Sequence, residues 1–127
     1  MCSVGTLESA ATERSRVVLL VDGDPLVRAV AASMLEDLGY EVVTAAGGRH
    51  AIDTIVADAR IEILITDVNM PDMDGFAVAQ AATRMRKELK VIILSGREND
   101  GRGFPLVRKP FLLGDLRRTM EQHTGLC

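Results

Sequence analysis

Short apolar stretches, each closed by polar or turn-forming residues, recur along the chain. The clearest of them, 17–21 and 91–94, are unbroken runs of Val, Ile and Leu. A short apolar run without polar residues at alternate positions predicts a strand that is buried on both faces. The predicted strands are residues 17–21, 40–44, 62–66, 91–94 and 104–107.

The segments between these runs carry apolar residues at helical spacing. Asp24 followed by Pro25 predicts a helix start, because Asp is a good N-cap and Pro suits the first helical position. Gly39 is the expected end of that helix. Three further helices are predicted at about 48–58, from Asp74-Gly75 onward, and in a last amphipathic segment that carries Leu112, Leu113, Leu116 and Met120.

Regular alternation of strands and helices predicts a parallel sheet with helices on both faces, an α/β fold. A length of 127 residues suits one domain with a real core. We expect the domain to span residues 16–124. Residues 1–15 are small and polar without any period, which predicts a flexible tail or linker.

Composition excludes several classes of function. A net charge of −3 and a pI of about 5.3 argue against direct binding of nucleic acid, which needs clustered positive charge. No apolar run approaches the roughly 18 residues of a membrane span, and the N-terminus has no signal-peptide pattern. Cys2 and Cys127 have neither metal-ligand spacing nor a disulfide pattern, so a reducing cytoplasm is expected.

Chemically useful residues follow four of the predicted strands: Asp22, Asp67, Ser95 and Lys109. The carboxyl ends of parallel strands meet at one edge of a sheet, so we expect these side chains to be neighbours. Two carboxylates can hold Mg²⁺, and one of them can attack phosphorus to form an acyl phosphate. The hydroxyl and the ammonium can bind phosphoryl oxygens.

Each residue also has a simpler explanation. Asp24 alone can be a helix cap, Ser95 a turn residue and Lys109 a solvated charge. Asp72 and Asp74 are expected to be turn and cap residues whatever the function. The joint placement of four such residues at strand ends favours phosphoryl chemistry over these separate explanations.

Four stretches of the chain resemble the receiver domain of bacterial two-component response regulators and hybrid histidine kinases. The most specific is Leu-Ile-Thr-Asp-Val-Asn-Met-Pro-Asp-Met-Asp-Gly at 64–75. The resemblance covers residues 16 to about 123, and the other stretches are 21–28, 92–96 and 108–111. It implies a flavodoxin-like, doubly wound fold with a five-stranded parallel sheet in the order 2-1-3-4-5.

The resemblance also implies roles for individual residues. Asp67 would be phosphorylated by the phosphohistidine of a histidine kinase or a histidine phosphotransfer protein. Asp22, Asp67 and the backbone carbonyl of Asn69 would hold Mg²⁺. Ser95 and Lys109 would bind the phosphoryl group, and the Lys109-Pro110 peptide bond is expected to be cis.

The chain departs from the family pattern at three places. Gly23 stands where the family has a second acidic residue, which should weaken Mg²⁺ binding unless Asp24 compensates through a water. Leu106 replaces the aromatic residue of the usual switch position. Ser95 and Lys109 are only 14 positions apart, and the intervening glycines and proline predict that the family's fourth helix is absent or cut to about one turn.

The sequence therefore leaves three hypotheses. The first is a phosphoacceptor receiver that alters protein–protein interactions, as a monomer or weak dimer, either free-standing or cut from a hybrid kinase. The second is a pseudo-receiver that binds proteins with little phosphorylation, as Gly23 and Leu106 suggest. The third is a haloacid-dehalogenase-like phosphatase built on Asp22 and Asp24, which leaves Asp67 unexplained.

Overall fold

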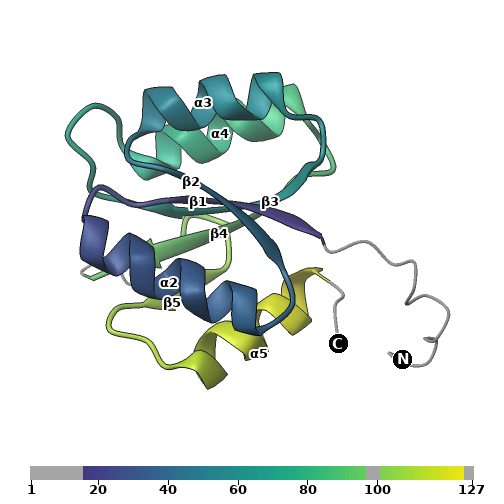
Figure 1. The fold of residues 1–127 in the computed structure, drawn as a ribbon. Coiled ribbons are helices and arrows are strands. Elements are labelled where there is room, and N and C mark those ends of the chain that lie inside the picture. Colours follow the sequence, from purple (N-terminus) through teal and green to yellow (C-terminus); the bar gives the residue numbers. More distant parts are fainter. Residues whose placement is uncertain (1–15, 97–100, 125–127) are drawn as a thin grey trace, which may run out of the picture.

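The computed structural model describes residues 16–96 and 101–124, which form five strands and four helices (Figure 1). The strands are β1 (Val17–Val21), β2 (Glu41–Ala45), β3 (Ile61–Asp67), β4 (Lys90–Ser95) and β5 (Leu106–Arg108). The helices are α2 (Pro25–Asp37), α3 (Gly48–Ala57), α4 (Gly75–Met85) and α5 (Leu113–Thr124).

The strands form one parallel sheet in the order β2-β1-β3-β4-β5. Figure 1 shows α3 and α4 on one face of this sheet and α2 and α5 on the other. The predicted flavodoxin-like, doubly wound fold with strand order 2-1-3-4-5 is therefore confirmed.

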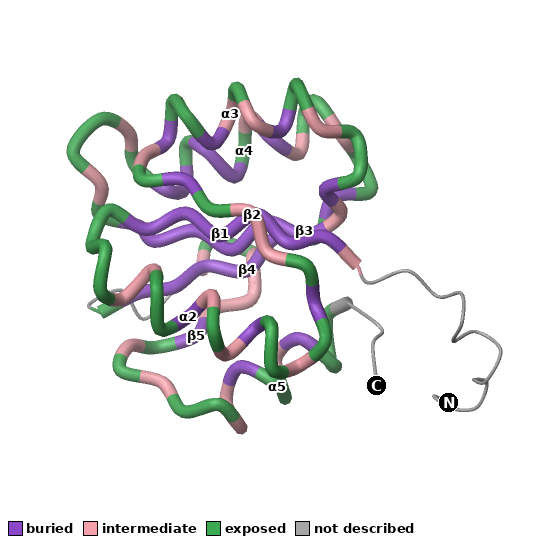
Figure 2. Tube along the Cα trace, viewed as in Figure 1, coloured by how far each residue is buried: buried purple, intermediate pink, exposed green. Residues whose placement is uncertain are grey.

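The core consists of two apolar clusters, one on each face of the sheet. In β1, Leu19 and Val21 pack on the side of α3 and α4, whereas Val18 and Leu20 pack on the side of α2 and α5. Figure 2 shows the central strands buried along their length, with exposed residues on the outer faces of the helices. Burial on both faces is the reason why these strands read as unbroken apolar runs in the sequence.

The last strand differs from its prediction of 104–107, since β5 begins only at Leu106. The N–H of Phe104 donates to the carbonyl of Gly101 at 2.9 Å, which closes a turn before the strand. Pro105 has no N–H to give to a ladder. Its carbonyl nevertheless accepts from the N–H of Ile93 at 2.8 Å, so the approach to β5 is already held against β4.

The apolar face predicted for the last helix is only partly correct. Leu116 and Met120 are buried, as predicted. Leu112 precedes α5 and is 73% exposed, and Leu113 at its first position is 40% exposed. The apolar residues of this segment therefore begin on the surface, before the part of the helix that is buried.

The connection between β4 and β5 is short. Its described residues, Gly96 and 101–105, contain no helix, which agrees with the predicted loss or reduction of the family's fourth helix. Residues 97–100, the predicted N-terminal tail and both cysteines lie outside the described residues. None of the described helices is long and apolar enough to cross a membrane.

Candidate functional site

Three of the four predicted side chains meet at the carboxyl edge of the sheet. Lys109, which directly follows β5, places its Nζ 2.9 Å from Oδ2 of Asp22 and 3.1 Å from Oδ1 of Asp67. One ammonium thus bridges two carboxylates that come from neighbouring strands. This contact joins residues that are 87 positions apart in the chain.

Asp22 is fixed by its backbone and by its side chain. Its N–H donates to the carbonyl of Ala45 at 3.2 Å, and its own carbonyl accepts from Nη1 of Arg28 at 2.6 Å. Its Oδ1 accepts from the N–H of Asp24 at 2.9 Å. Because the residue is only 1% exposed, its carboxylate has little freedom to turn away from the site.

Asp67 is the last residue of β3 and is 8% exposed. Its Oδ1 accepts from the N–H of Val68 at 2.9 Å as well as from Lys109. Within the described residues, Oδ2 receives no hydrogen bond. Helix α4 starts directly against this residue, since a Cβ at Gly75 would lie 1.9 Å from the Asp67 carbonyl oxygen. A larger residue at Gly75 would therefore displace Asp67.

The bridge changes the titration of the groups it joins. Burial raises the pKa of Asp67, and the negative charge of Asp22 adds to that effect against the opposing pull of Lys109. Burial alone would lower the pKa of Lys109, but its hydrogen bonds to Asp22 and Asp67 outweigh burial and raise that pKa. Lys109 is therefore a cation throughout the neutral range.

The carboxylates open into a depression of about 580 Å³ at this edge. Carboxylate and carbonyl oxygens are the hard donors that Mg²⁺ prefers, so the donor set around this depression fits a divalent ion. The lining residues are Asp22, Gly23, Asp24, Asp67, Asn69, Pro71, Gly96 and Lys109. Within residues 16–96 and 101–124, however, no three Asp, Glu, His or Cys side chains come together as a metal cluster.

Asp24 does not join Asp22 and Asp67 as a third carboxylate in the site. Its Oδ1 accepts from the N–H groups of Leu26 and Val27, at 2.9 and 3.3 Å, and so caps α2. The Asp24 carboxylate is therefore turned toward the helix rather than toward Asp22 and Asp67. Gly23 adds no side chain to the site, although a Cβ there would meet only ordinary contacts with Pro71 and Ala46, the shorter at 3.6 Å.

The remaining predicted residues occupy the β4 and β5 side of the site. Ser95 ends β4 and is fully buried, and its carbonyl accepts from the Lys109 N–H at 2.8 Å. Leu106 pairs with Ile93 and packs on the side of α3 and α4 as a half-buried aliphatic residue. The Lys109-Pro110 peptide bond is cis.

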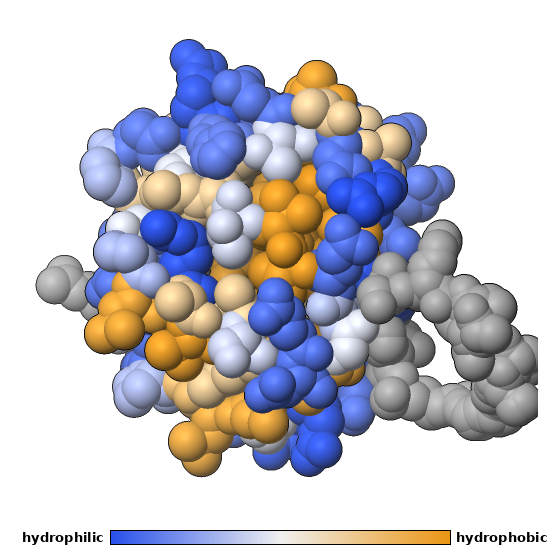
Figure 3. All heavy atoms as spheres, in the orientation of Figure 1, coloured by the Kyte–Doolittle hydropathy of each residue, from blue (hydrophilic) through white to orange (hydrophobic). Residues whose placement is uncertain are grey.

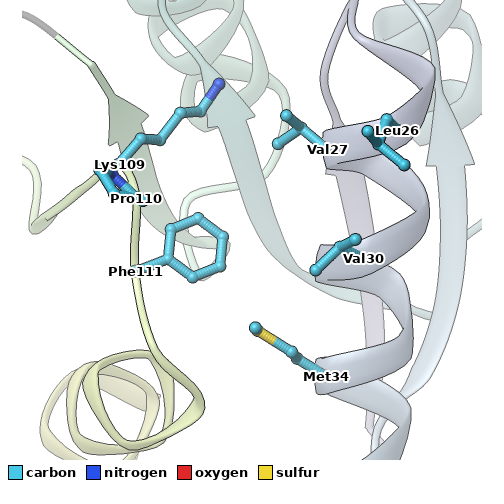
Figure 4. A pocket seen from close by; sticks show the side chains of 7 residues that line it. All are labelled: Leu26, Val27, Val30, Met34, Lys109, Pro110 and Phe111. Carbon is cyan, nitrogen blue, oxygen red and sulfur yellow. The ribbon is translucent and has the colours of Figure 1, made fainter.

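An apolar groove of about 460 Å³ adjoins the site, and Lys109 lines both. Figure 4 shows the Phe111 ring facing Val30 and Met34 of α2 across this groove. Leu26 at its end is 72% exposed. Figure 3 shows apolar surface, in orange, over the start of α2 and over the segment that leads into α5. Leu26 and Val30 have the helical spacing of a core-facing apolar stripe, yet the structure exposes both.

Comparison with known proteins identifies the family. The family model of the response regulator receiver domain matches residues 18–104. The chain therefore belongs to this family of two-component signalling domains. The sensor histidine kinase RcsC of Salmonella typhimurium is 34% identical over 87 residues. That match covers 68% of this chain but 9% of RcsC, so the chain spans about a tenth of the kinase's length.

Solved structures agree with this assignment. The chemotaxis protein CheY4 of Vibrio cholerae is 30% identical with a TM-score of 0.80, and the match covers 87% of this chain and 99% of CheY4. The response regulator TrrA of Thermotoga maritima, solved with Mg²⁺ and BeF, is 25% identical with a TM-score of 0.77. That match covers 84% of this chain and 97% of TrrA.

Two residues near the site make contacts that the sequence did not predict. Arg28 binds the carbonyl of Asp22, and Asp72 binds the start of α3. Arg28 stands one helical turn beyond Asp24, so an arginine early in a helix that follows an acidic strand end was a usable signal. Asp72 gave no such signal, because its partners are more than 20 positions away along the chain.

Proposed function

We propose that this receiver domain accepts a phosphoryl group on Asp67. The observation that carries the proposal is the Lys109 bridge between Asp67 and Asp22 at the floor of an open depression. Oδ2 of Asp67 attacks phosphorus while the bond from phosphorus to the donor's imidazole nitrogen breaks, which yields an acyl phosphate and free histidine. Lys109 then leaves the Asp67 carboxylate and binds the phosphoryl oxygens.

Mg²⁺ belongs to this proposal. Asp22, Asp67 and the backbone carbonyl of Asn69 would hold it, and when bound it would offset negative charge on the phosphoryl oxygens. Asp22 would then hold the ion while its Oδ2 accepts from Lys109 at 2.9 Å. With only two side-chain carboxylates available, we expect Mg²⁺ to bind more weakly than in a site with three.

The donor in this proposal is a protein, namely a histidine kinase or a histidine phosphotransfer protein. The apolar groove supports this choice, because it begins at Lys109 and continues along α2. A protein that places a phosphohistidine over the depression can cover the groove at the same time. Phosphorylation then alters protein–protein interactions, and the domain acts as an acceptor rather than a turnover enzyme.

The test uses a small phosphodonor with Mg²⁺ and intact-protein mass spectrometry. The wild-type chain should gain the mass of one phosphoryl group, and Asp67→Asn should gain none. Asp53→Asn, which changes an exposed aspartate of α3, is the matched control and should behave like the wild type. A wild-type chain that gains no mass, or an Asp67→Asn variant that still does, contradicts the proposal.

A second candidate is a pseudo-receiver that binds partners without phosphorylation. The observation that favours it is that the Asp24 carboxylate caps α2 and that its neighbour Gly23 has no side chain to offer a metal ion. Titration with Mg²⁺ separates the two functions, because Gly23→Asp adds a third carboxylate at a position with room for it. Binding by the wild type supports the acceptor, whereas binding by Gly23→Asp alone supports the pseudo-receiver.

A further inference from the structure

Helix α3 begins without a cap of its own. Gly47 occupies its N-cap position and makes no side-chain hydrogen bond. The cap comes instead from Asp72, in the loop between β3 and α4. Its Oδ1 accepts from the N–H of Gly48 and its Oδ2 from the N–H of Arg49, both at 3.0 Å.

The loop that carries Asp72 also carries one wall of the site. It runs from Asp67 to the start of α4, and Asn69 and Pro71 in it line the depression. Its two ends are held locally, by the hydrogen bond from the Gly75 N–H to the Val68 carbonyl and by the Asp74 cap of α4. Among the hydrogen bonds within the described residues, only those of Asp72 tie the middle of this loop to another part of the fold.

Close packing accompanies these hydrogen bonds. A Cβ at Gly48 would lie 2.6 Å from Cβ of Met73 and 2.7 Å from Cγ2 of Val78. The loop therefore presses directly on the first turn of α3, where the sequence has two glycines in succession. A carboxylate at a helix N-terminus is favourable, and the two N–H bonds hold the pKa of Asp72 below its usual range. Asp72 is thus ionised at neutral pH, and the contact persists there.

We propose that Asp72 is a positioning residue for the Mg²⁺ and phosphoryl site, an inference that depends on the proposed function. It fixes the middle of the loop against α3 and so sets where the Asn69 carbonyl lies relative to Asp22 and Asp67. Mg²⁺ demands nearly ideal octahedral geometry, so a displaced carbonyl weakens its binding. Because Gly23 supplies no third carboxylate, the affinity for Mg²⁺ depends more strongly on each of the remaining oxygen ligands.

The matched control for this inference is Asp58, at the other end of the same helix. Its Oδ1 accepts from the backbone N–H and from Nε of Arg60, both at 3.0 Å, and its Oδ2 accepts from Arg60 Nη2 at 2.9 Å. Asp58→Ala therefore removes a carboxylate that accepts three hydrogen bonds, at the C-cap of α3 and at the edge of the sheet away from the site. If Asp72 acts only through the general stability of the fold, the two alanine variants will behave alike.

The experiment compares Mg²⁺ affinity by calorimetric titration, amide exchange at Gly48 and Arg49, and phosphoryl mass gain. Asp72→Ala should weaken Mg²⁺ binding about tenfold, in the range seen when outer residues of metal sites are changed, and should speed exchange at both amides. Asp72→Asn keeps one oxygen acceptor and should fall between Ala and the wild type, which also covers the case that Asp72→Ala does not fold. Asp58→Ala should keep the wild-type Mg²⁺ affinity.

The outcomes separate this inference from the proposed function. Wild-type Mg²⁺ affinity in a folded Asp72 variant with faster amide exchange overturns the positioning role alone, as does an equal loss of affinity in Asp58→Ala. A wild-type chain that neither binds Mg²⁺ nor gains a phosphoryl group overturns the proposed function and the positioning role with it.

Discussion

The two helical layers of this domain are built differently. On one face of the sheet, α3 and α4 pack against each other and bury a continuous cluster that includes Ile55, Phe76 and Ala82. On the other face, α2 and the segment leading into α5 leave an apolar groove between them, with Leu26 exposed at its end. We refer to these as the closed layer and the open layer.

The two layers also differ in what they contribute to the proposed phosphoryl site. The closed layer holds the loop after Asp67 in place, through Gly75 and the contact of Asp72 with α3. The open layer offers accessible apolar surface that begins at Lys109. A signalling domain needs both, because phosphoryl transfer requires fixed geometry and a partner requires an accessible surface.

The largest expected effect tests the closed layer as the source of rigidity. Ile55→Ala removes a fully buried side chain from α3 and should lower the free energy of unfolding by about 2–5 kcal/mol. Val30→Ala, in the open layer, removes a side chain that is 46% exposed and should change it by about 0.5 kcal/mol or less. Urea unfolding followed by circular dichroism measures both, and equal losses would remove the distinction between the layers.

The next effect concerns Lys109, which stands where the site meets the open layer. Lys109→Met leaves Asp22 and Asp67 side by side without a cation and should lower the free energy of unfolding at pH 7 by about 1–3 kcal/mol. Because folding raises the pKa of Lys109 above its ordinary 10.5, its contribution is present below pH 10.5 and is lost as the pH rises through the folded pKa. Unfolding curves at pH 7 and above pH 10.5 should show the two proteins converging, and a constant difference would contradict this.

A smaller effect tests the open layer as a docking surface. Leu26→Ala should slow phosphoryl transfer from a phosphorylated histidine phosphotransfer protein about three- to tenfold, which corresponds to roughly 1 kcal/mol of lost contact. Transfer from a small phosphodonor should be unchanged. Val56→Ala, at a position 68% exposed on α3 of the closed layer, is the control and should leave both rates unchanged. Equal slowing in the two variants would argue against the groove.

The smallest effect concerns the cost of burying the Asp67 carboxylate. Since folding raises the pKa of Asp67, its ionised form is disfavoured in the fold, and wild-type stability should fall as the pH rises through that pKa. Asp67→Asn without Mg²⁺ should therefore melt about 1–4 °C above the wild type at pH 7. The gain should shrink as the pH falls toward the ordinary value of 3.8. Calorimetry in the presence of a chelator measures this, and a variant that melts lower at pH 7 would contradict it.

The sequence was sufficient for the parts of the molecule that depend on local pattern. The Asp24 cap follows from the Asp24-Pro25 pair, and the meeting of Asp22, Asp67 and Lys109 follows from the geometry of parallel sheets. The strand order was implied by the resemblance to receiver domains.

Features that depend on distant partners were not predictable in this way. Asp72 reads as a turn residue, and its role at α3 appears only when two loops separated in sequence are brought together. Leu26 and Leu112 fit helical periods, yet both are exposed because helical spacing alone does not say where a neighbouring helix stops covering the face. The groove that results is a property of packing between elements.

The most direct test of phosphoryl acceptance is chemical mapping of the modified residue. The chain is treated with a phosphodonor and Mg²⁺, the acyl phosphate is reduced with borohydride to the corresponding alcohol, and peptides are sequenced by mass spectrometry. We predict that the aspartate-to-homoserine conversion falls on Asp67 and requires Mg²⁺. Conversion at Asp22 or Asp24, or none at any aspartate, would contradict the assignment of Asp67 as the phosphoryl acceptor.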